Sequence, residues 1–353
     1  MKAIIKRQIK SYLKNPVFWV GILVVFIEVY RLLVPYLTIH YVEKDEKLAT
    51  EEGKIWDWEG DIMDGYVPST PEKQRKLWEN SIFNSLMKDF EMSEAEATLV
   101  IQEIQDMEID KACQYLEDNY KYYGAEYAYE DFQYHAGSRE EINQYIREKL
   151  NEHNFSYYFS RKFADYIGLY MGFFATIFLA FLFMQDMKKN TYELLHTKSI
   201  KGWKYIFGKT VSGFLLMLFV LILLNVGFFV LCKIAGYQAG FSAHPLDFLK
   251  STVFYILPNM VMICSVYGLV SLLFRNPLPA VPMLILYMLY SNMLRIGENG
   301  SYIGRPLAIM VRFPGNFFDT TPPPLALLNQ TFLLIASVFL FCITVYLWKR
   351  RRI

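Results

Sequence analysis

The pattern closest to a chemical motif is Gly208-Lys209-Thr210, which looks like the end of a phosphate-binding loop. That loop needs four residues between its first glycine and Gly-Lys-Thr, and it follows a strand. Here five residues separate Gly202 from Gly208, no strand pattern precedes them, and an apolar run follows. We therefore expect no nucleotide at this position, and no other part of the chain resembles an ATP site.

Signatures of catalysis are missing from the sequence. It contains no HExxH, GxSxG or CxxC pattern, and none of its five histidines lies in an apolar run. Cys113 lies in an acidic block, and Cys232, Cys264 and Cys342 lie in or at the ends of apolar runs, which favours structural roles. We expect no catalytic site and no metal site, and this weighs against a membrane-embedded enzyme.

Some polar side chains interrupt the apolar runs. Glu28 and Arg31 are three residues apart, on one face of a predicted helix, and Asn225, Asn259 and Asn292 each stand in a further run. Polar groups at membrane depth often mark function. These five residues are a candidate translocation path. The alternatives are a self-neutralising Glu28–Arg31 pair and amides that bond neighbouring helices.

The elements that would position these residues follow from an uneven composition. Residues 38–160 carry 28 acidic and 12 basic residues, a balance of −16, whereas the rest of the chain carries 7 acidic and 24 basic residues, a balance of +17. Outside the acidic block, long uncharged runs dominate. The sequence therefore predicts an integral membrane protein with one charged domain.

Six segments approach the roughly 20 apolar residues that a membrane-spanning helix needs. They are Pro16–Leu37, Tyr166–Gln185, Thr210–Cys232, Ser251–Phe274, Leu278–Leu294 and Ala326–Trp348, of which the fifth is the shortest. The predicted fold is all-α, with six spans. Its parts are residues 1–37 (an interfacial helix and span one), 38–160, and 161–353 (spans two to six).

Basic residues predict the orientation of these spans. Lysines and arginines crowd the first 15 residues, the loop 186–209 and the tail after Trp348, and Arg275 follows span four. Basic loops stay in the cytoplasm. Six crossings place all four regions there, so we expect a plasma-membrane protein with both termini cytoplasmic and residues 38–160 outside.

The N-terminal stretch predicts a short amphipathic helix. Ile5, Ile9, Tyr12 and Leu13 share one face, and lysines and an arginine share the other. Such a helix can lie in the membrane interface, and Asn15-Pro16 ends it before span one. The alternative is a basic leader with no structure of its own.

Residues 38–160 predict a small, mainly helical domain. Pro71–Phe90 has a helical apolar stripe, and Ser93-x-x-Glu96 and Ser138-x-x-Glu141 are capping boxes. We expect 120–134 to be irregular and the last helix to continue into span two. The acidity of the domain suits a cationic ligand, or it is simply a solvated surface.

The loop 186–209 is too short for a domain but long enough for a helix along the membrane surface. The basic N-terminal helix, the six spans, this loop with Glu193 at its centre and the long segment before span six together resemble the ABC-2 type permeases. In that family, the loop between spans two and three carries a coupling helix that docks on a separate ATPase. The resemblance implies this contact for 186–201, centred on Thr191, Tyr192, Glu193, Leu194 and Leu195.

The resemblance also implies a function and partners. The chain would be the transmembrane subunit of an ABC transporter, exporting or extracting a peptide, lipid or other amphipathic substrate. ATP and Mg²⁺ would bind the partner ATPase and no cofactor would bind this chain. A second, identical or similar permease and membrane lipid are the other expected partners, and no nucleic acid is expected. The alternative is a transporter-like sensor whose outer domain binds a ligand.

Overall fold

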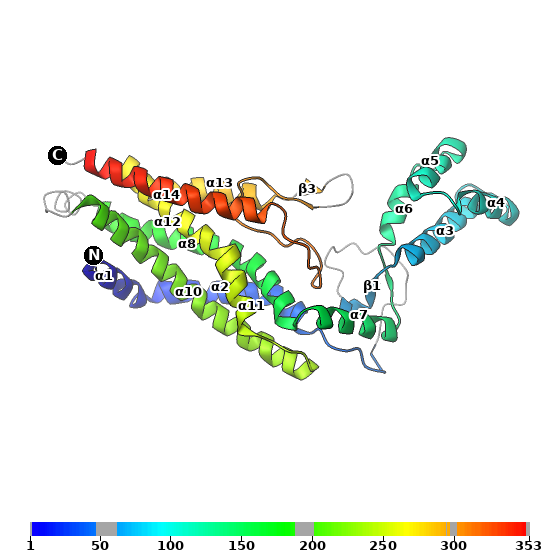
Figure 1. Cartoon of the computed structure of the whole chain (residues 1–353), viewed down its shortest axis with the longest axis horizontal. Helices are drawn as coiled ribbons and strands as arrows, with labels where there is room; N and C mark the ends of the chain where they lie inside the picture. The colour runs from blue at the N-terminus through cyan, green and yellow to red at the C-terminus, as the bar shows by residue number, and fades with distance from the viewer. Residues whose placement is uncertain (1, 47–61, 188–200, 294, 297–301, 351–353) are drawn as a thin grey trace. The chain divides into compact units, whose positions relative to one another are not determined.

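The computed structural model describes residues 2–46, 62–187, 201–293, 295–296 and 302–350. The chain divides into two compact units, residues 1–38 with 153–353 and residues 39–152. Figure 1 shows the helices of both. The second unit begins one residue after and ends eight residues before the limits predicted for the acidic domain, 38–160.

The first unit is a helical bundle. Its elements are α1 (Lys2–Leu13), α2 (Pro16–Leu37), α8 (Phe155–Met187), α10 (Gly202–Ala239), α11 (Pro245–Ser251), the π-helical turn η2 (Thr252–Ile256), α12 (Leu257–Phe274), α13 (Ala280–Asn292), the strand pair β3 (Arg295–Ile296) and β4 (Tyr302–Ile303), and α14 (Ala326–Arg350).

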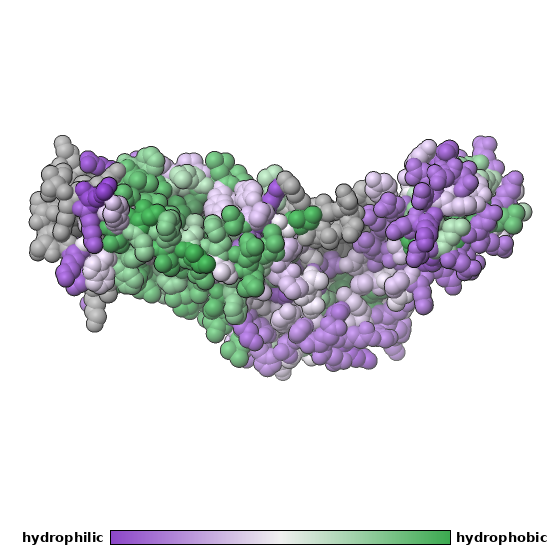
Figure 2. All heavy atoms as spheres, turned by 45° about the horizontal axis from the view of Figure 1, so that its top comes forward, coloured by the Kyte–Doolittle hydropathy of each residue, from purple (hydrophilic) through white to green (hydrophobic). Residues whose placement is uncertain are grey.

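Burial separates inner from outer helices in this bundle. In the most apolar stretch of α8, 67% of the residues are buried, and in that of the run from α11 to α12, 72% are buried. The corresponding values for α2, α10 and α14 are 28%, 33% and 22%. The outer helices expose large apolar side chains such as Val20, Val226 and Ile335, and Figure 2 shows such side chains gathered over the bundle. An apolar exterior fits a lipid surrounding.

Five helical segments in the described residues are long and apolar enough to cross a membrane. The predicted sixth span, Leu278–Leu294, is helical only as α13, with 13 residues. At 1.5 Å per residue, such a helix covers about 20 Å of a hydrocarbon core about 30 Å thick. By length and composition, five helices can therefore cross the membrane, and the sixth crossing stays a prediction.

Helix ends in the bundle follow local sequence signals. Asn15 caps α2 by accepting from the Val17 N–H at 3.0 Å, and Pro16 takes the first position, where its missing N–H costs nothing. The predicted limits Pro16–Leu37 are therefore confirmed. Spans two and three are longer than predicted because α8 and α10 include polar ends, as discussed below.

The second unit contains η1 (Ile62–Asp64), β1 (Tyr66–Pro68), α3 (Pro71–Lys88), α4 (Glu94–Ile104), α5 (Ile109–Tyr120), α6 (Ala125–Asp131), β2 (Tyr134–Ala136) and α7 (Arg139–Glu152). Strands β1 and β2 pair antiparallel, with Val67 opposite His135. The core is built around Trp78, Ile82, Leu86 and Leu116, all fully buried. The prediction of a mainly helical unit is confirmed for these residues.

Two predictions for this unit were wrong. The segment 120–134 is not irregular throughout, because it contains α6, whose Ala125 is buried and whose carbonyl accepts from the Trp78 indole at 2.8 Å. The last helix also does not continue into span two. It ends at Glu152, and α8 begins at Phe155. Both capping boxes predicted from the sequence, at Ser93 and Ser138, are formed.

Candidate functional site

The predicted ATPase contact lies outside the described residues. Thr191, Tyr192, Glu193, Leu194 and Leu195 fall between Met187, where α8 ends, and Gly202, where α10 begins. The structure therefore defines the two helices that lead into and out of this segment. Its own conformation stays a prediction.

The helices around this segment converge at one end of the bundle, which we call the terminal end. The N- and C-termini of the described chain both lie there (Figure 1). The Tyr12 hydroxyl donates to the Phe178 carbonyl of α8 at 3.0 Å, and Tyr205 of α10 stacks on Trp348 of α14 at 4.5 Å between ring centroids. The described parts of three of the regions predicted to be cytoplasmic, namely α1, the start of α10 and the end of α14, therefore lie at this end. The compartment that they face stays a prediction.

The predicted N-terminal helix exists as α1, which packs against α10. Tyr12 is buried, and Ile5, Ile9 and Leu13 are half-buried. The apolar face predicted for a membrane interface therefore lies, at least through Tyr12, against the bundle. Its opposite face carries the exposed Lys6, Arg7 and Lys10.

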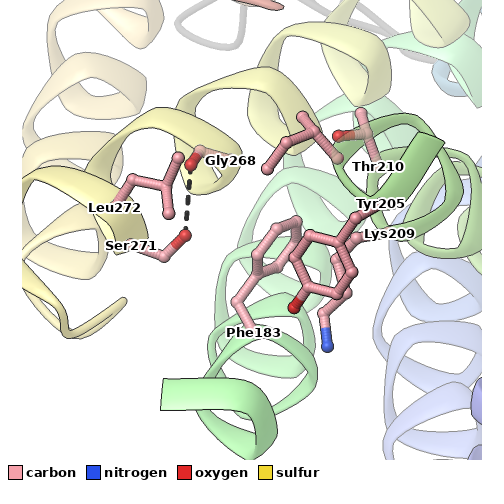
Figure 3. A pocket seen from close by; sticks show the side chains of 8 residues that line it. Phe183, Tyr205, Lys209, Thr210, Gly268, Ser271 and Leu272 are labelled. Atoms are coloured by element: carbon pink, nitrogen blue, oxygen red, sulfur yellow. Dashed lines mark hydrogen bonds between the residues drawn. The ribbon is translucent and has the colours of Figure 1, made fainter. Parts of the chain in front are cut away.

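The Gly208-Lys209-Thr210 sequence lies inside α10, so its backbone is committed to a helix and forms no phosphate cradle. Lys209 is only 3% exposed and lies 5.6 Å from the ring centroid of Phe183. With Tyr205, Gly268 and their neighbours it lines a cavity of about 10 Å³ (Figure 3). That space accommodates about one water molecule, and no substrate.

The candidate path residues are not brought together. Arg31 and Glu28 lie 3.8 Å apart, with 72% and 41% of their side chains exposed, on the outer surface of α2. This geometry matches the self-neutralising pair. Asn292 is half-buried at the end of α13, and its side-chain oxygen has no hydrogen-bond partner among the described residues.

The other two asparagines join helices. The Asn225 amide donates to the Leu221 carbonyl within α10 and its oxygen accepts from the Thr252 hydroxyl at 2.9 Å. Asn259 of α12 accepts from the Gln330 amide of α14 at 3.3 Å. Each amide therefore bonds a side chain of a neighbouring helical segment, which agrees with the alternative interpretation.

A cluster of buried charges was missed by the sequence analysis. Arg161, Lys162 and Asp165 lie near the start of α8, with 8%, 2% and 4% of their surfaces exposed. Arg312, from residues 304–325 between β4 and α14, forms a bidentate ion pair with Asp165. We call residues 304–325 the strap. The available signal was the Arg-Lys-x-x-Asp pattern just before span two, which looked like an ordinary charged boundary.

The strap packs onto the end of the bundle opposite the terminal end. Its residues Ile309, Phe313, Phe317 and Phe318 are buried, and the Ile309 N–H donates to the Ser291 hydroxyl of α13 at 2.9 Å. The apolar pieces 309–311 and 317–318 of the strap therefore contact helices of this chain.

The strand-poor bundle, its apolar exterior and its five candidate spans define a membrane-embedded helical protein. A family model described as "ABC-2 family transporter protein" matches residues 2–314. The chain belongs to this family, which confirms the resemblance drawn from its sequence. No match was found to a curated protein or to a solved structure. Permeases of this family work, in general, with an ABC ATPase.

Proposed function

We propose that this chain is the transmembrane subunit of an ATP-driven transporter that exports a peptide, lipid or other amphipathic substrate, or extracts it from the membrane. It has no catalytic role of its own. ATP and Mg²⁺ bind a separate cytoplasmic ATPase, and two permease subunits, identical or similar, form the lipid-embedded pathway.

Family membership and the convergence of helices at the terminal end support this proposal. Helix α1, the start of α10 and the end of α14 meet there, around the two helix ends that bracket residues 188–200. A segment held between two long helices can transmit a push from a docked partner, because a helix moves as a rigid element. The proposal places the ATPase at this end, in the cytoplasm.

The unit 39–152 has its own core and lies, in this proposal, outside the cell. A single proposed crossing, α2, precedes this unit in the chain, so a cytoplasmic N-terminus places the unit outside. There it receives the substrate or gates its exit.

The test is a pull-down of the tagged full chain from its native membrane in mild detergent, with partners identified by mass spectrometry and ATPase activity measured. We expect an ABC ATPase to co-purify with the wild type and to be lost from Glu193→Ala with Leu194→Ala. A matched control, Glu28→Ala with Leu32→Ala on the exposed side of α2, keeps the ATPase. Absence of any ATPase, or capture of a kinase instead, contradicts the transporter and favours the sensor.

A further inference from the structure

Helix α1 and the residue that follows it carry three strips of side chains. Gln8 and Tyr12 form a buried strip, with 7% and 4% of their surfaces exposed. Beside it lies a half-buried apolar strip of Ile5, Ile9 and Leu13. The third strip is exposed and positively charged, and we call it the basic strip: Lys6, Arg7, Lys10 and Lys14. Side chains four residues apart share a face of a helix, so the three lysines stand in one row.

The charges of the basic strip have no countercharge beside them in the described part of the chain. The first acidic residue of the sequence is Glu28, in the second half of α2. Among the described residues, no carboxylate forms an ion pair with any of the four basic side chains. Four positive charges therefore face the surroundings together, and they favour a negatively charged partner outside the chain.

Tyr12 fixes the depth of α1 along the bundle. Its hydroxyl donates to the Phe178 carbonyl of α8 at 3.0 Å. Phe178 lies seven positions before Gln185, where the uncharged run Tyr166–Gln185 ends, and seven residues are about 10 Å of helix. Amphipathic helices at a membrane surface lie about 5–10 Å deep, in the boundary between headgroups and acyl chains. The end of α1 therefore lies at the level of this boundary.

The side chains around the basic strip suit lipid better than a protein surface. The half-buried apolar strip borders it, so apolar and cationic groups are presented together, as an interfacial helix presents them to acyl chains and headgroups. Trp19 of α2 is 43% exposed, and its indole donates to the Leu13 carbonyl at 2.9 Å. Tryptophan is enriched at membrane–water interfaces. From that level, lysine side chains reach phosphate groups while their alkyl stems stay on apolar surface.

We infer that the basic strip binds the headgroups of anionic phospholipids, with the apolar strip among the upper parts of their acyl chains. The lipid phosphates supply negative charge next to α1, and each basic residue near an anionic membrane surface adds to the attraction. Bound lipid then holds α1 beside α8 and α10, together with the Tyr12 hydrogen bond. The inference goes beyond the proposed function, because this lipid is a fixed partner of α1 and not the transported substrate.

The experiment measures which lipid lies beside α1. Ser11→Cys carries a fluorophore, since Ser11 is exposed and lies on the helix next to Arg7 and Lys14. Cys113→Ala and Cys342→Ser remove the native thiols that are not buried, so that the label goes to position 11. The full chain is placed in nanodiscs of phosphatidylcholine with a minority of phosphatidylglycerol. Two preparations have the same composition and the same amount of a nitroxide near the top of an acyl chain, carried either by phosphatidylglycerol or by phosphatidylcholine.

We expect the nitroxide on phosphatidylglycerol to quench the fluorophore roughly fivefold more strongly than the nitroxide on phosphatidylcholine, because anionic lipid gathers at the basic strip. This preference is expected to fall as salt is added, since salt screens exposed charges. Equal quenching by the two lipids overturns the inference. Absence of quenching by either lipid also overturns it, because the basic strip then lies away from the bilayer, which favours an acidic protein surface as its partner.

Variants separate the basic strip from a general attraction of the protein for anionic lipid. Lys10→Gln with Lys14→Gln is expected to lower the preference roughly threefold, and Lys10→Arg with Lys14→Arg is expected to keep it. Lys349→Gln with Arg350→Gln, which removes the same charge from the exposed end of α14, also keeps it. A preference that the glutamine pair in α1 leaves unchanged contradicts the assignment. Because no ATPase is present, failure here leaves the ATPase proposal standing, and the reverse is also true.

Discussion

Asp165 and Arg312 are 147 positions apart in the sequence and form a bidentate ion pair, in which the Arg312 Nε and Nη2 groups donate to the two Asp165 oxygens. The side chain of Asp165 is 5% exposed and that of Arg312 is 20% exposed. The pair ties the strap to α8 one turn away from Arg161 and Lys162. Its loss has a larger expected cost than the loss of any exposed pair.

Asp165→Asn is expected to lower the free energy of unfolding by about 3 kcal/mol, because it removes the buried carboxylate to which Arg312 donates two hydrogen bonds. Thermal unfolding in nanodiscs measures the effect. Glu28→Gln is the matched control. It breaks the exposed pair with Arg31, and its expected effect is below about 1 kcal/mol.

The double variant Asp165→Asn with Arg312→Gln completes a cycle for this pair. It is expected to be more stable than the sum of the two single variants predicts, because removing both charges leaves none uncompensated. Strictly additive effects contradict a coupled pair.

Tyr12→Phe is expected to loosen the docking of α1. The hydroxyl donates to the Phe178 carbonyl at 3.0 Å, in a buried position. A net hydrogen bond is worth about 1 kcal/mol, so hydrogen exchange of the α1 amides is expected to accelerate roughly fivefold. Tyr237→Phe, whose side chain is 85% exposed, is the control and leaves α1 unchanged. Unchanged exchange in Tyr12→Phe contradicts a stabilising role for this bond.

Gly202→Ala is expected to disturb the start of α10. A Cβ atom added at position 202 would overlap Cδ1 of Trp348, so the indole must move from its stack on Tyr205. Overpacking of this kind costs about 1–3 kcal/mol, and a shift of tryptophan fluorescence reports the movement, with Trp348→Phe identifying the emitter.

Gly168→Ala is the control for that change. An added Cβ at position 168 meets nothing within 4 Å, and alanine is favoured over glycine in a helix by roughly 0.5–1 kcal/mol. Equal destabilisation by both substitutions means that backbone effects, and not Trp348, dominate.

The acidic unit is expected to lose stability between about pH 4.5 and pH 2. The pKa of Glu141 is lowered to about 2, from an ordinary value of 4.5. The largest cause is the hydrogen bond from the Ser138 backbone N–H, and the next is the hydrogen bond from the Lys73 ammonium. The stabilisation is therefore complete above the ordinary pKa and disappears as the pH falls through the lowered one.

Pepsin cleavage within residues 62–152 of the full chain measures this loss, because pepsin acts across that range. The ratio of cleavage rates between Glu141→Gln and the wild type is expected to be largest near pH 4.5 and to approach one near pH 2. A ratio that does not change with pH contradicts the assigned role of the carboxylate.

The fold was largely predictable because its signals are local. Asn15-Pro16 sets the start of α2, and uncharged runs mark the long helices. The predicted starts of spans two and three, Tyr166 and Thr210, lie too late in the chain. A prediction from hydropathy excludes charged residues from a span, and charged residues stand just before both positions. In the structure, Lys162 is satisfied by the strap and Lys209 lies against an aromatic ring, so the helices continue through them.

The charged site was not predictable, because its partners are remote in sequence. Nothing in the sequence near Asp165 identifies Arg312 as its partner. Every residue has a backbone carbonyl, so the amino-acid sequence does not show that Gly315 accepts a hydrogen bond from Lys162. Helix α6 was missed for a related reason. Its packing on Trp78 comes from tertiary structure, while its own seven residues carry no clear apolar period.

The π-helical turn η2 sets the relative orientation of two polar contacts, one on either side of it along the chain. It adds a residue to one turn between α11 and α12, so that Ser251 meets Ser160 of α8 while Asn259 meets Gln330 of α14. Deleting one residue from 252–256 to restore a regular α-helix turns everything before it by about 100° relative to everything after it. Only one of the two contacts can then form. The one-residue insertion therefore lets one continuous helical segment present polar side chains to two neighbouring helices at the same time.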